Sequence, residues 1–405
     1  MQTRFTGSFT QQEPIDDDAI AAALAVLRSG RLHRYNLVDG EAGETALLEQ
    51  DFAAMTGARF CLAVASGGYA MATVLRAHGV AAGDRVLTNA FTLAPVPGAI
   101  AAAGAVPVYV EVTDQLVIDL DDLAAKIASS GARCLLLSHM RGHIADMEAL
   151  MAICDAAGVA VIEDCAHTMG AAWNGVASGR HGLAACFSTQ TYKHINSGEG
   201  GLIITDDADL MARTIILSGS YMLYDRHLAA PPPETFARIR LETPNCSGRM
   251  DNLRAAILRP QLRLLADRVE GWNRRYRWVE DGLRNIPGLV LIERPGAEAF
   301  VGSSIQFRLP DFAKPAILDV QAGCARRGVE LKWFGADQPV GFTSRHDSWQ
   351  YAPPQDMPQS DLVLAGLLDM RLPLTFSEDD CRLIASIIAD EVIAAGQRNP
   401  TKETP

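Results

Sequence analysis

The segment ARCLLLSHMRGHIADMEALMAICDAAGVAVIED, residues 132–164, decides the fold. Two apolar runs, at 132–138 and 159–164, have the length of fully buried strands. Between them Met147, Leu150 and Cys154 lie at i, i+3 and i+7, the spacing of one helix face. A strand, a helix and a second strand in this order indicate two parallel strands joined by a crossover helix.

The same alternation continues on both sides of this segment. Short apolar runs, each with a helical pattern after it, lie at 61–65, 84–89 and 106–112. Two further apolar runs, AACFS at 184–188 and GLIITDD at 201–207, follow the segment. The sequence therefore predicts an α/β protein with a mainly parallel central sheet covered by helices on both faces.

The pattern changes after about residue 255, which indicates a second domain. A long helical stretch, 255–283, leads to strand-like runs at 289–295 and 303–309, a helix over 317–328 and an irregular segment at 333–358. A chain of 405 residues is long enough for two domains that share an interface. We expect a large domain over 1–255 and a smaller C-terminal α+β domain over 256–405. The latter ends in a polar tail, 396–405, that we expect to fray.

Composition and charge exclude several classes of protein. The net charge of −12 argues against a broad basic surface for nucleic acid or anionic lipid. The uncharged run at 91–110 contains three prolines and two glycines, so we interpret it as a helix and a strand, not a membrane span. Eight cysteines occur singly with no CxxC pair, and the first residues lack the apolar core of a signal peptide. We expect a cytoplasmic protein with reduced thiols that binds neither nucleic acid nor membrane.

Small and polar residues follow the predicted strands at the edge where ligands bind in parallel sheets. The sequence ASGGYAM at 65–71 places two glycines before a helix, where backbone N–H groups can hold a phosphate. In VAVIEDCAHTMG, Glu163 or Asp164 must have a cationic or proton-donating partner or be satisfied by backbone amides, because an isolated buried charge is costly. Cys165 and His167 have no second ligand cluster, so we expect no metal site.

Lys193 lies in FSTQTYKHINSGEGG, residues 187–201, between two apolar runs. A single lysine in a loop is usually a solvated charge. The alternative is an amine held in a site for covalent chemistry. The glycines at 198–201 precede a strand, not a helix, so they do not form a dinucleotide-binding fingerprint. A phosphate cradle, a buried carboxylate and a lysine at one sheet edge are together what pyridoxal phosphate requires.

Several segments, in the same order along the chain, resemble the DegT/StrS family of aminotransferases, which act on keto-sugars, often nucleotide-linked, and on cyclitols. The likeness covers roughly residues 20–390. The segments that carry it are SGRLHRYN, LLEQDFAAMTG, VASGGYAM, GAIAAAGAVPVYVEV, SHMRGHIADM, IEDCAHTMGAAWNG, GLAACFSTQTYKHINSGEGGLIITDD, SGRMDNLRAAILRPQL and LPLTFSEDD. The resemblance implies the aspartate-aminotransferase fold, fold type I of the enzymes that use pyridoxal 5'-phosphate. It also implies a homodimer with active sites at the subunit interface.

The resemblance assigns roles to three residues that would contact the reactive part of the cofactor. Lys193 matches the Schiff-base lysine, and Asp164 matches the partner of the pyridine nitrogen. His167 matches the residue that contacts the phenolic oxygen. A carboxylate that faces a cation should have a lowered pKa, so we expect a lowered pKa at Asp164.

The phosphate-binding residues follow from the same resemblance. Ser188 matches the serine five residues before the lysine, and Gly67, Gly68 and Tyr69 would supply backbone amides. Family members often have threonine where Gly68 stands, so one hydroxyl contact is absent here. The asparagine that reaches the partner subunit's phosphate aligns with Ser247, with Asn245 as the alternative.

Two other positions depart from the family pattern. The aromatic residue that stacks on the cofactor ring aligns with Leu93, although Phe91 is close by. Where HxYG is common this chain has HMRG, which places Arg141 near the expected mouth of the site. A guanidinium there can bind a carboxylate or phosphate of a substrate, or it can form a structural ion pair with Asp146 or another carboxylate.

The expected activity is transfer of an amino group from an amino acid, glutamate or glutamine, to a keto group of a sugar, cyclitol or related small metabolite. One alternative is a dehydratase or another lyase that uses the same cofactor. Relatives that eliminate water can carry histidine at the Schiff-base position, so Lys193 favours transamination. Another alternative is a non-catalytic regulatory protein that binds pyridoxal phosphate, although no DNA-binding extension is evident.

Overall fold

The computed structural model describes residues 3–38 and 40–398. Its largest sheet has seven strands in the order β1-β9-β8-β5-β4-β2-β3, and all are parallel except β9. The strands are β1 (Phe60–Val64), β2 (Arg85–Asn89), β3 (Val106–Val110), β4 (Cys134–Ser138), β5 (Ala160–Asp164), β8 (Ala184–Ser188) and β9 (Gly201–Thr205). Each coincides with an apolar run of the sequence, so the predicted mainly parallel sheet is confirmed.

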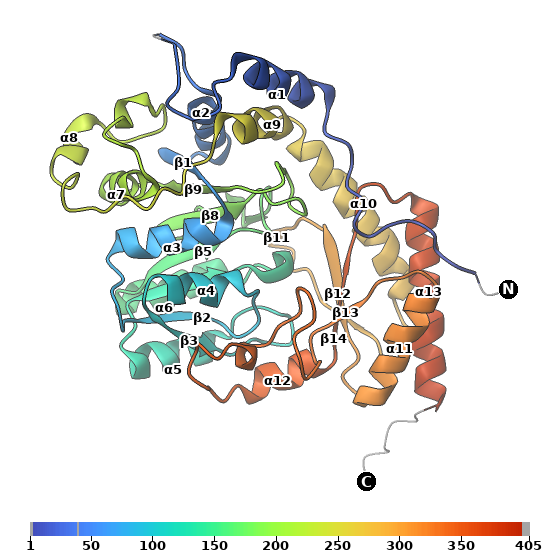
Figure 1. The fold of residues 1–405 in the computed structure, drawn as a ribbon. Coiled ribbons are helices and arrows are strands. Elements are labelled where there is room, and N and C mark those ends of the chain that lie inside the picture. The colour runs from blue at the N-terminus through green and yellow to red at the C-terminus, as the bar shows by residue number, and fades with distance from the viewer. Residues whose placement is uncertain (1–2, 39, 399–405) are drawn as a thin grey trace.

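Helices cover both faces of this sheet, as predicted (Figure 1). On one face lie α3 (Gly67–His78), α4 (Pro95–Ala102), α7 (Ala208–Ser218) and α8 (Pro233–Ala237). On the other face lie α2 (Glu44–Thr56), α5 (Leu120–Ser130), α6 (Met147–Ala157) and α9 (Asn252–Leu262). Nearly all side chains of these strands are apolar, and they point alternately toward the two helical layers. Both faces of the sheet are therefore buried.

Side-chain caps fix where many of these helices begin. Five helices, among them α1 (Asp17–Ser29), start after an aspartate whose carboxylate accepts a hydrogen bond from a backbone N–H of the first turn. The five aspartates are Asp16, Asp119, Asp146, Asp207 and Asp251. The capping role of Asp146 at α6 means that it is not the ion-pair partner that the sequence offered for Arg141.

The smaller unit is a four-stranded antiparallel sheet in the order β10-β12-β14-β13. Its strands are β10 (Val290–Leu291), β12 (Ser304–Arg308), β13 (Lys332–Trp333) and β14 (Leu367–Arg371). One face packs on α10 (Leu265–Leu283), α11 (Lys314–Arg326) and α13 (Glu378–Arg398) in a separate hydrophobic core. The predicted α+β character of this half is thus confirmed.

The remaining elements connect the two units. A three-stranded sheet joins β6 (Ala172–Trp173) and β7 (Val176–Ala177) to β11 (Glu298–Ala299), and α12 (Pro358–Ala365) precedes β14. Three short 3-10 turns lie at Met140–Gly142, Tyr224–Arg226 and His346–Ser348. In Figure 1 the long helix α10 runs from α9 across to α11 and α13.

The boundary between the domains stays a prediction, and the packing favours a position slightly later than residue 255. The predicted helical stretch 255–283 is two helices, and the first of them, α9, packs on α1 and α2 of the large unit. In contrast, Phe5 and Phe9 from the N-terminal arm lie in the core of the small unit. We propose a boundary between α9 and α10. Residues 399–405 of the predicted polar tail lie outside the described residues.

Among the described helices, none combines the length and the apolar character needed to cross a bilayer.

Candidate active site

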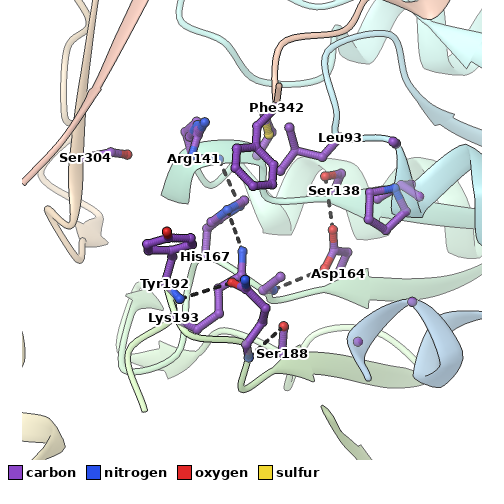
Figure 2. Close-up of a pocket in the computed structure, with 18 of the residues that line it drawn as sticks. Leu93, Ser138, Arg141, Asp164, His167, Ser188, Tyr192, Lys193, Ser304 and Phe342 are labelled. Atoms are coloured by element: carbon purple, nitrogen blue, oxygen red, sulfur yellow. Dashed lines mark hydrogen bonds between the residues drawn. The ribbon is translucent and has the colours of Figure 1, made fainter. Parts of the chain in front are cut away.

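A cavity of about 440 Å3 lies at the carboxyl ends of the large sheet's strands and extends to the small sheet. Loops after β1, β2, β4, β5 and β8 line one side of it, as the sequence predicted for a parallel sheet. Lys193, His167, Asp164 and Ser188 surround one part of this space (Figure 2). The cavity is the place to test each residue that the sequence selected.

Lys193 is half-buried, and its amine faces a histidine instead of solvent. Its Nζ lies 2.8 Å from Nε2 of His167. The backbone N–H of Arg141 donates to Nδ1 of the same ring, at 3.3 Å. A neutral imidazole that accepts at Nδ1 carries its hydrogen on Nε2, so the ring donates to Lys193 and needs a lone pair on Nζ. This contact therefore suits an uncharged amine.

The electrostatic surroundings of Lys193 agree with this arrangement. Burial is the main cause that lowers its pKa from 10.5 to about 7; Asp164 acts in the opposite direction, and the cations Arg141, Arg371 and Lys332 add to the lowering. Burial and the neighbouring Lys193 hold the pKa of His167 well below its usual value. The amine and the imidazole can thus both be neutral near pH 7, and a neutral lysine is a nucleophile.

The structure separates the roles of the two carboxylates that end β5. Successive strand residues point to opposite faces, and the Glu163 side chain is fully buried away from the cavity. Glu163 accepts hydrogen bonds from His139 and from three backbone N–H groups. Asp164 lines the cavity, and among the described residues its carboxylate accepts only from the Ser138 hydroxyl, at 3.3 Å, and the Ala166 N–H, at 3.1 Å.

Asp164 has no ion pair within the described residues. Burial raises its pKa, and this effect outweighs the attraction of Lys193, so the expected lowering of this pKa is wrong for the polypeptide itself. A buried carboxyl group with spare acceptor capacity suits a cationic N–H from a bound molecule. His139, Glu163 and Cys165 also come close enough to hold a metal ion, but the four donors on Glu163 already account for its burial.

The predicted phosphate cradle lies where α3 begins. Gly67 and Gly68 form the first turn, whose N–H groups have no preceding carbonyl to pair with. A Cβ on Gly67 would lie 3.0 Å from Cβ of Ser188, so glycine lets the two segments approach. Gly201 is required for a related reason: a Cβ there would lie 2.6 Å from the backbone of Ser66. Gly200 and Gly201 thus serve close packing at the start of β9, in agreement with the rejected dinucleotide fingerprint.

Tyr69 lies differently from what the resemblance implied. Its N–H donates to the Ser66 hydroxyl, which caps α3, and its own hydroxyl donates to the Leu217 carbonyl. Tyr69 does not line the described part of the cavity. Its amide is therefore already engaged, and the role of Tyr69 in phosphate binding stays a prediction.

The other selected residues divide between the cavity and the surface. Leu93 lines the cavity, whereas Phe91 is buried outside it against Phe334. Asn245 and Ser247 are both exposed, and the structure brings neither into the cavity. Their exposure is compatible with a reach to a partner subunit, which stays a prediction.

Arg141 lines the cavity but is committed to another contact. Its guanidinium lies 2.7 Å from Oδ2 of Asp369, and both side chains are buried. The backbone at Arg141 is left-handed, with φ of 56°, which turns its N–H toward His167. Of the two roles that the sequence left open, the structure shows the ion pair. Arg141 thereby connects the large domain to β14 of the small one.

Several lining residues were missed by the sequence reasoning, among them Tyr192, Phe342 and Arg371. Tyr192 directly precedes Lys193, and Phe342 comes from the segment 333–358 that the sequence marked as irregular. Arg371 ends β14, directly before LPLTF, and only the alternation LLDMR could have marked it as facing away from the core.

Comparisons with known proteins agree with this geometry. The family model described as the DegT/DnrJ/EryC1/StrS aminotransferase family matches residues 13–387. The chain belongs to this family. The expected family and the expected aspartate-aminotransferase fold are confirmed.

Three known proteins illustrate what this member of the DegT/DnrJ/EryC1/StrS family is similar to. An L-glutamine:scyllo-inosose aminotransferase of Streptomyces griseus is 31% identical, over 73% of this chain and 69% of its own length. A pleiotropic regulatory protein of Geobacillus stearothermophilus is 35% identical, over 52% of this chain and 54% of its own. The crystal structure of 3-amino-5-hydroxybenzoic acid synthase superposes with a TM-score of 0.80 and 26% identity, covering 96% of this chain and 99% of that one.

Proposed function

We propose that this protein is a pyridoxal-phosphate-dependent aminotransferase that moves an amino group from glutamate or glutamine to a keto group of a small metabolite. The observation that carries the proposal is the pair formed by the Lys193 amine and His167 at 2.8 Å, opposite the carboxyl group of Asp164. Family membership supports the same activity.

The residues of the cavity fit the cofactor. Asp164 is a buried carboxyl group with spare acceptor capacity, as the protonated pyridine nitrogen requires. Gly67, Gly68 and Ser188 form a close-packed turn at a helix N-terminus, where a phosphate is stabilised. Leu93 offers an apolar surface for one face of the ring. When bound, the cofactor supplies an aldehyde for amine exchange and an electron-withdrawing ring.

The chain's own groups would then bind, orient and transfer protons. Lys193 Nζ, with its pKa near 7, can take a proton from the donor carbon that bears the nitrogen. In the second half of the reaction it can return a proton to the acceptor carbon that receives the nitrogen. His167 donates from Nε2 and holds the position of Nζ, and the Arg141 N–H fixes the ring of His167. Ser138 donates to Asp164 and keeps its carboxyl group directed into the cavity.

The names of two relatives suggest substrate classes. One acts on scyllo-inosose with L-glutamine as donor, and another, 30% identical over 67% of this chain, is a UDP-N-acetyl-3-dehydro-alpha-D-glucosamine 3-aminotransferase of Acidithiobacillus ferrooxidans. From these names we infer for this protein only an amino-acid donor and an acceptor with a keto group.

We also propose a homodimer in which each active site receives residues from both subunits. Asn245 and Ser247 are exposed, and Tyr221 and Met222, from a segment that Arg249 connects to them, expose large apolar side chains. Arg249 packs over the Tyr221 ring, at 4.9 Å, and donates to the Gly219 carbonyl, so this surface is ordered without a partner.

The decisive experiment compares the purified protein with its Lys193→Ala variant after incubation with pyridoxal phosphate. The wild type should gain a visible absorbance band that disappears when glutamate or glutamine is added and returns with a keto acceptor. The variant should show neither this visible band nor turnover. Retention of both by the variant would refute the assignment of Lys193.

The same assay separates the two alternative functions. A dehydratase or lyase would form its product without an amino donor. A regulatory protein that only binds the cofactor would keep its band in the presence of every donor. The regulatory relative of Geobacillus stearothermophilus makes this second comparison necessary.

A further inference from the structure

The small sheet has one apolar face and one polar face. Ile305, Phe307, Leu368 and Met370 alternate along β12 and β14 and pack into the small domain's core. The residues between them point the other way, toward the cavity and the large domain. On this polar face lie Ser304, Gln306 and Arg308 of β12, Asp369 and Arg371 of β14, and Lys332 of β13.

The register of the sheet brings these side chains together. Ser304 is directly opposite Arg371, and Gln306 is directly opposite Asp369. Lys332 faces Asp369 from the other side. Cross-strand partners share a face, so Lys332 and Arg371 lie near the carboxylate of Asp369 on the neighbouring strands β13 and β14.

Two of the four charged residues on this face are already paired. Asp369 accepts from Gln306 at 2.8 Å and pairs with Arg141, and Arg308 pairs with Asp114. Within the described residues neither Arg371 nor Lys332 forms an ion pair. The Nζ of Lys332 is buried and has no hydrogen-bond partner among the described residues. Burial lowers the pKa of Lys332 to about 8, and Lys332 does not line the described part of the cavity, so Arg371 is the unpaired cation of this face that a ligand can reach.

Arg371 is held in place beside the reactive amine. Its guanidinium carbon lies 3.6 Å from the ring centre of Tyr192, the neighbour of Lys193 in sequence, and 5.2 Å from that of Phe342. All three residues line the cavity. Figure 2 shows Tyr192 and Phe342 on the same space that Lys193 faces. Stacking fixes the plane of the guanidinium and leaves its edge, with paired N–H donors, for a ligand.

We propose that Arg371 binds the carboxylate of both substrates, so that the amino-group acceptor is itself a carboxylic acid. This inference rests on the proposed aminotransferase function. Donor and acceptor occupy one site in turn, and a neutral ring ketone would leave Arg371 without an anionic partner. A planar guanidinium matches a carboxylate with two parallel hydrogen bonds.

A carboxylate is favoured over a phosphate or nucleotide because of space. The cavity of about 440 Å3 is near the lower end of the range for ligand sites, and it must hold the cofactor as well as the substrate. The remaining volume suits a small acid.

The experiment uses the cofactor-loaded enzyme, converted to its aminated form with glutamate and then separated from the donor. The return of the visible band is measured with pyruvate, with its neutral amide pyruvamide, with scyllo-inosose and with dihydroxyacetone phosphate. Pyruvate should react with the largest second-order rate constant. In Arg371→Gln the constant for pyruvate should fall about 10- to 100-fold, the loss expected for charge-assisted hydrogen bonds, and that for pyruvamide should change far less.

Arg308→Gln is the matched control, because it removes the same charge from the same sheet face at a residue paired with Asp114. It should leave the preference for pyruvate over pyruvamide unchanged. Arg371→Lys should restore only part of the rate, since an ammonium group lacks the two parallel donors.

Several results would overturn the proposal. One is a faster reaction of the wild type with scyllo-inosose or dihydroxyacetone phosphate than with pyruvate. Another is no reaction with pyruvate. The third is an equal loss of the rate constant for pyruvate and for pyruvamide in Arg371→Gln. Failure of the proposed function looks different, because glutamate and glutamine would then leave the band of the wild type unchanged.

Discussion

The most informative prediction concerns the charge of Lys193 in the absence of added cofactor. Burial lowers the pKa of this amine from 10.5 to about 7. At pH 7 an ordinary lysine is neutral in about one molecule in 3,000, whereas one with a pKa near 7 is neutral in about half, a gain of about 1,500-fold. The shift of about 3.5 units corresponds to roughly 5 kcal/mol between the charged and neutral forms.

The rate at which the cofactor-free protein captures pyridoxal phosphate reports this charge. Stopped-flow growth of the visible band should accelerate about tenfold per pH unit below pH 7 and become constant above it. Capture by Nα-acetyl-lysine in the same buffers provides the correction for the titration of the cofactor itself. A corrected rate that keeps rising to pH 10 would show that the amine is solvated and would refute the argument from burial.

Three further substitutions test the supports of the site. Arg141→Gln leaves the buried Asp369 unpaired and should reduce the unfolding free energy by about 3–5 kcal/mol in urea titrations, and adding Asp369→Asn should recover most of it. Burial raises the pKa of Glu163, but its hydrogen bonds with His139 and the backbone outweigh burial, so the net shift of the pKa is downward. Its contribution to stability is therefore present above about pH 4.5 and lost as pH falls through the lowered value. Glu163→Gln should cost about 3 kcal/mol at pH 7 and give a shallower decline of stability below pH 4.5; an unchanged acid profile would contradict this. Gly201→Ala should cost about 1–3 kcal/mol and weaken cofactor binding, because its Cβ would meet the turn after β1, whereas Gly296→Ala, with open space around it, should do neither.

The large domain could be predicted because its information is local. Buried parallel strands are short continuous apolar runs, and each was visible in a window of a few residues. Ligand-binding loops then follow from the topology, which is why Lys193 and the Gly67–Gly68 turn were found at one sheet edge. Which of Glu163 and Asp164 faces the cavity could not be predicted from the local sequence. Adjacent strand residues face opposite sides of the sheet, and the sequence does not say which side holds the cavity.

The small domain's contribution could not be predicted, because it depends on pairing between distant segments. In LLDMR the alternation marks Asp369 and Arg371 as facing one side, yet such a face is usually solvent. Only the register with Lys332 shows two cations around one acid, and only the fold shows that this acid is taken by Arg141. Of the two roles that the sequence left open for Arg141, the structure shows the ion pair, with Asp369. Within the described residues Arg371, which the sequence did not select, is left without an ion pair and can bind an anion.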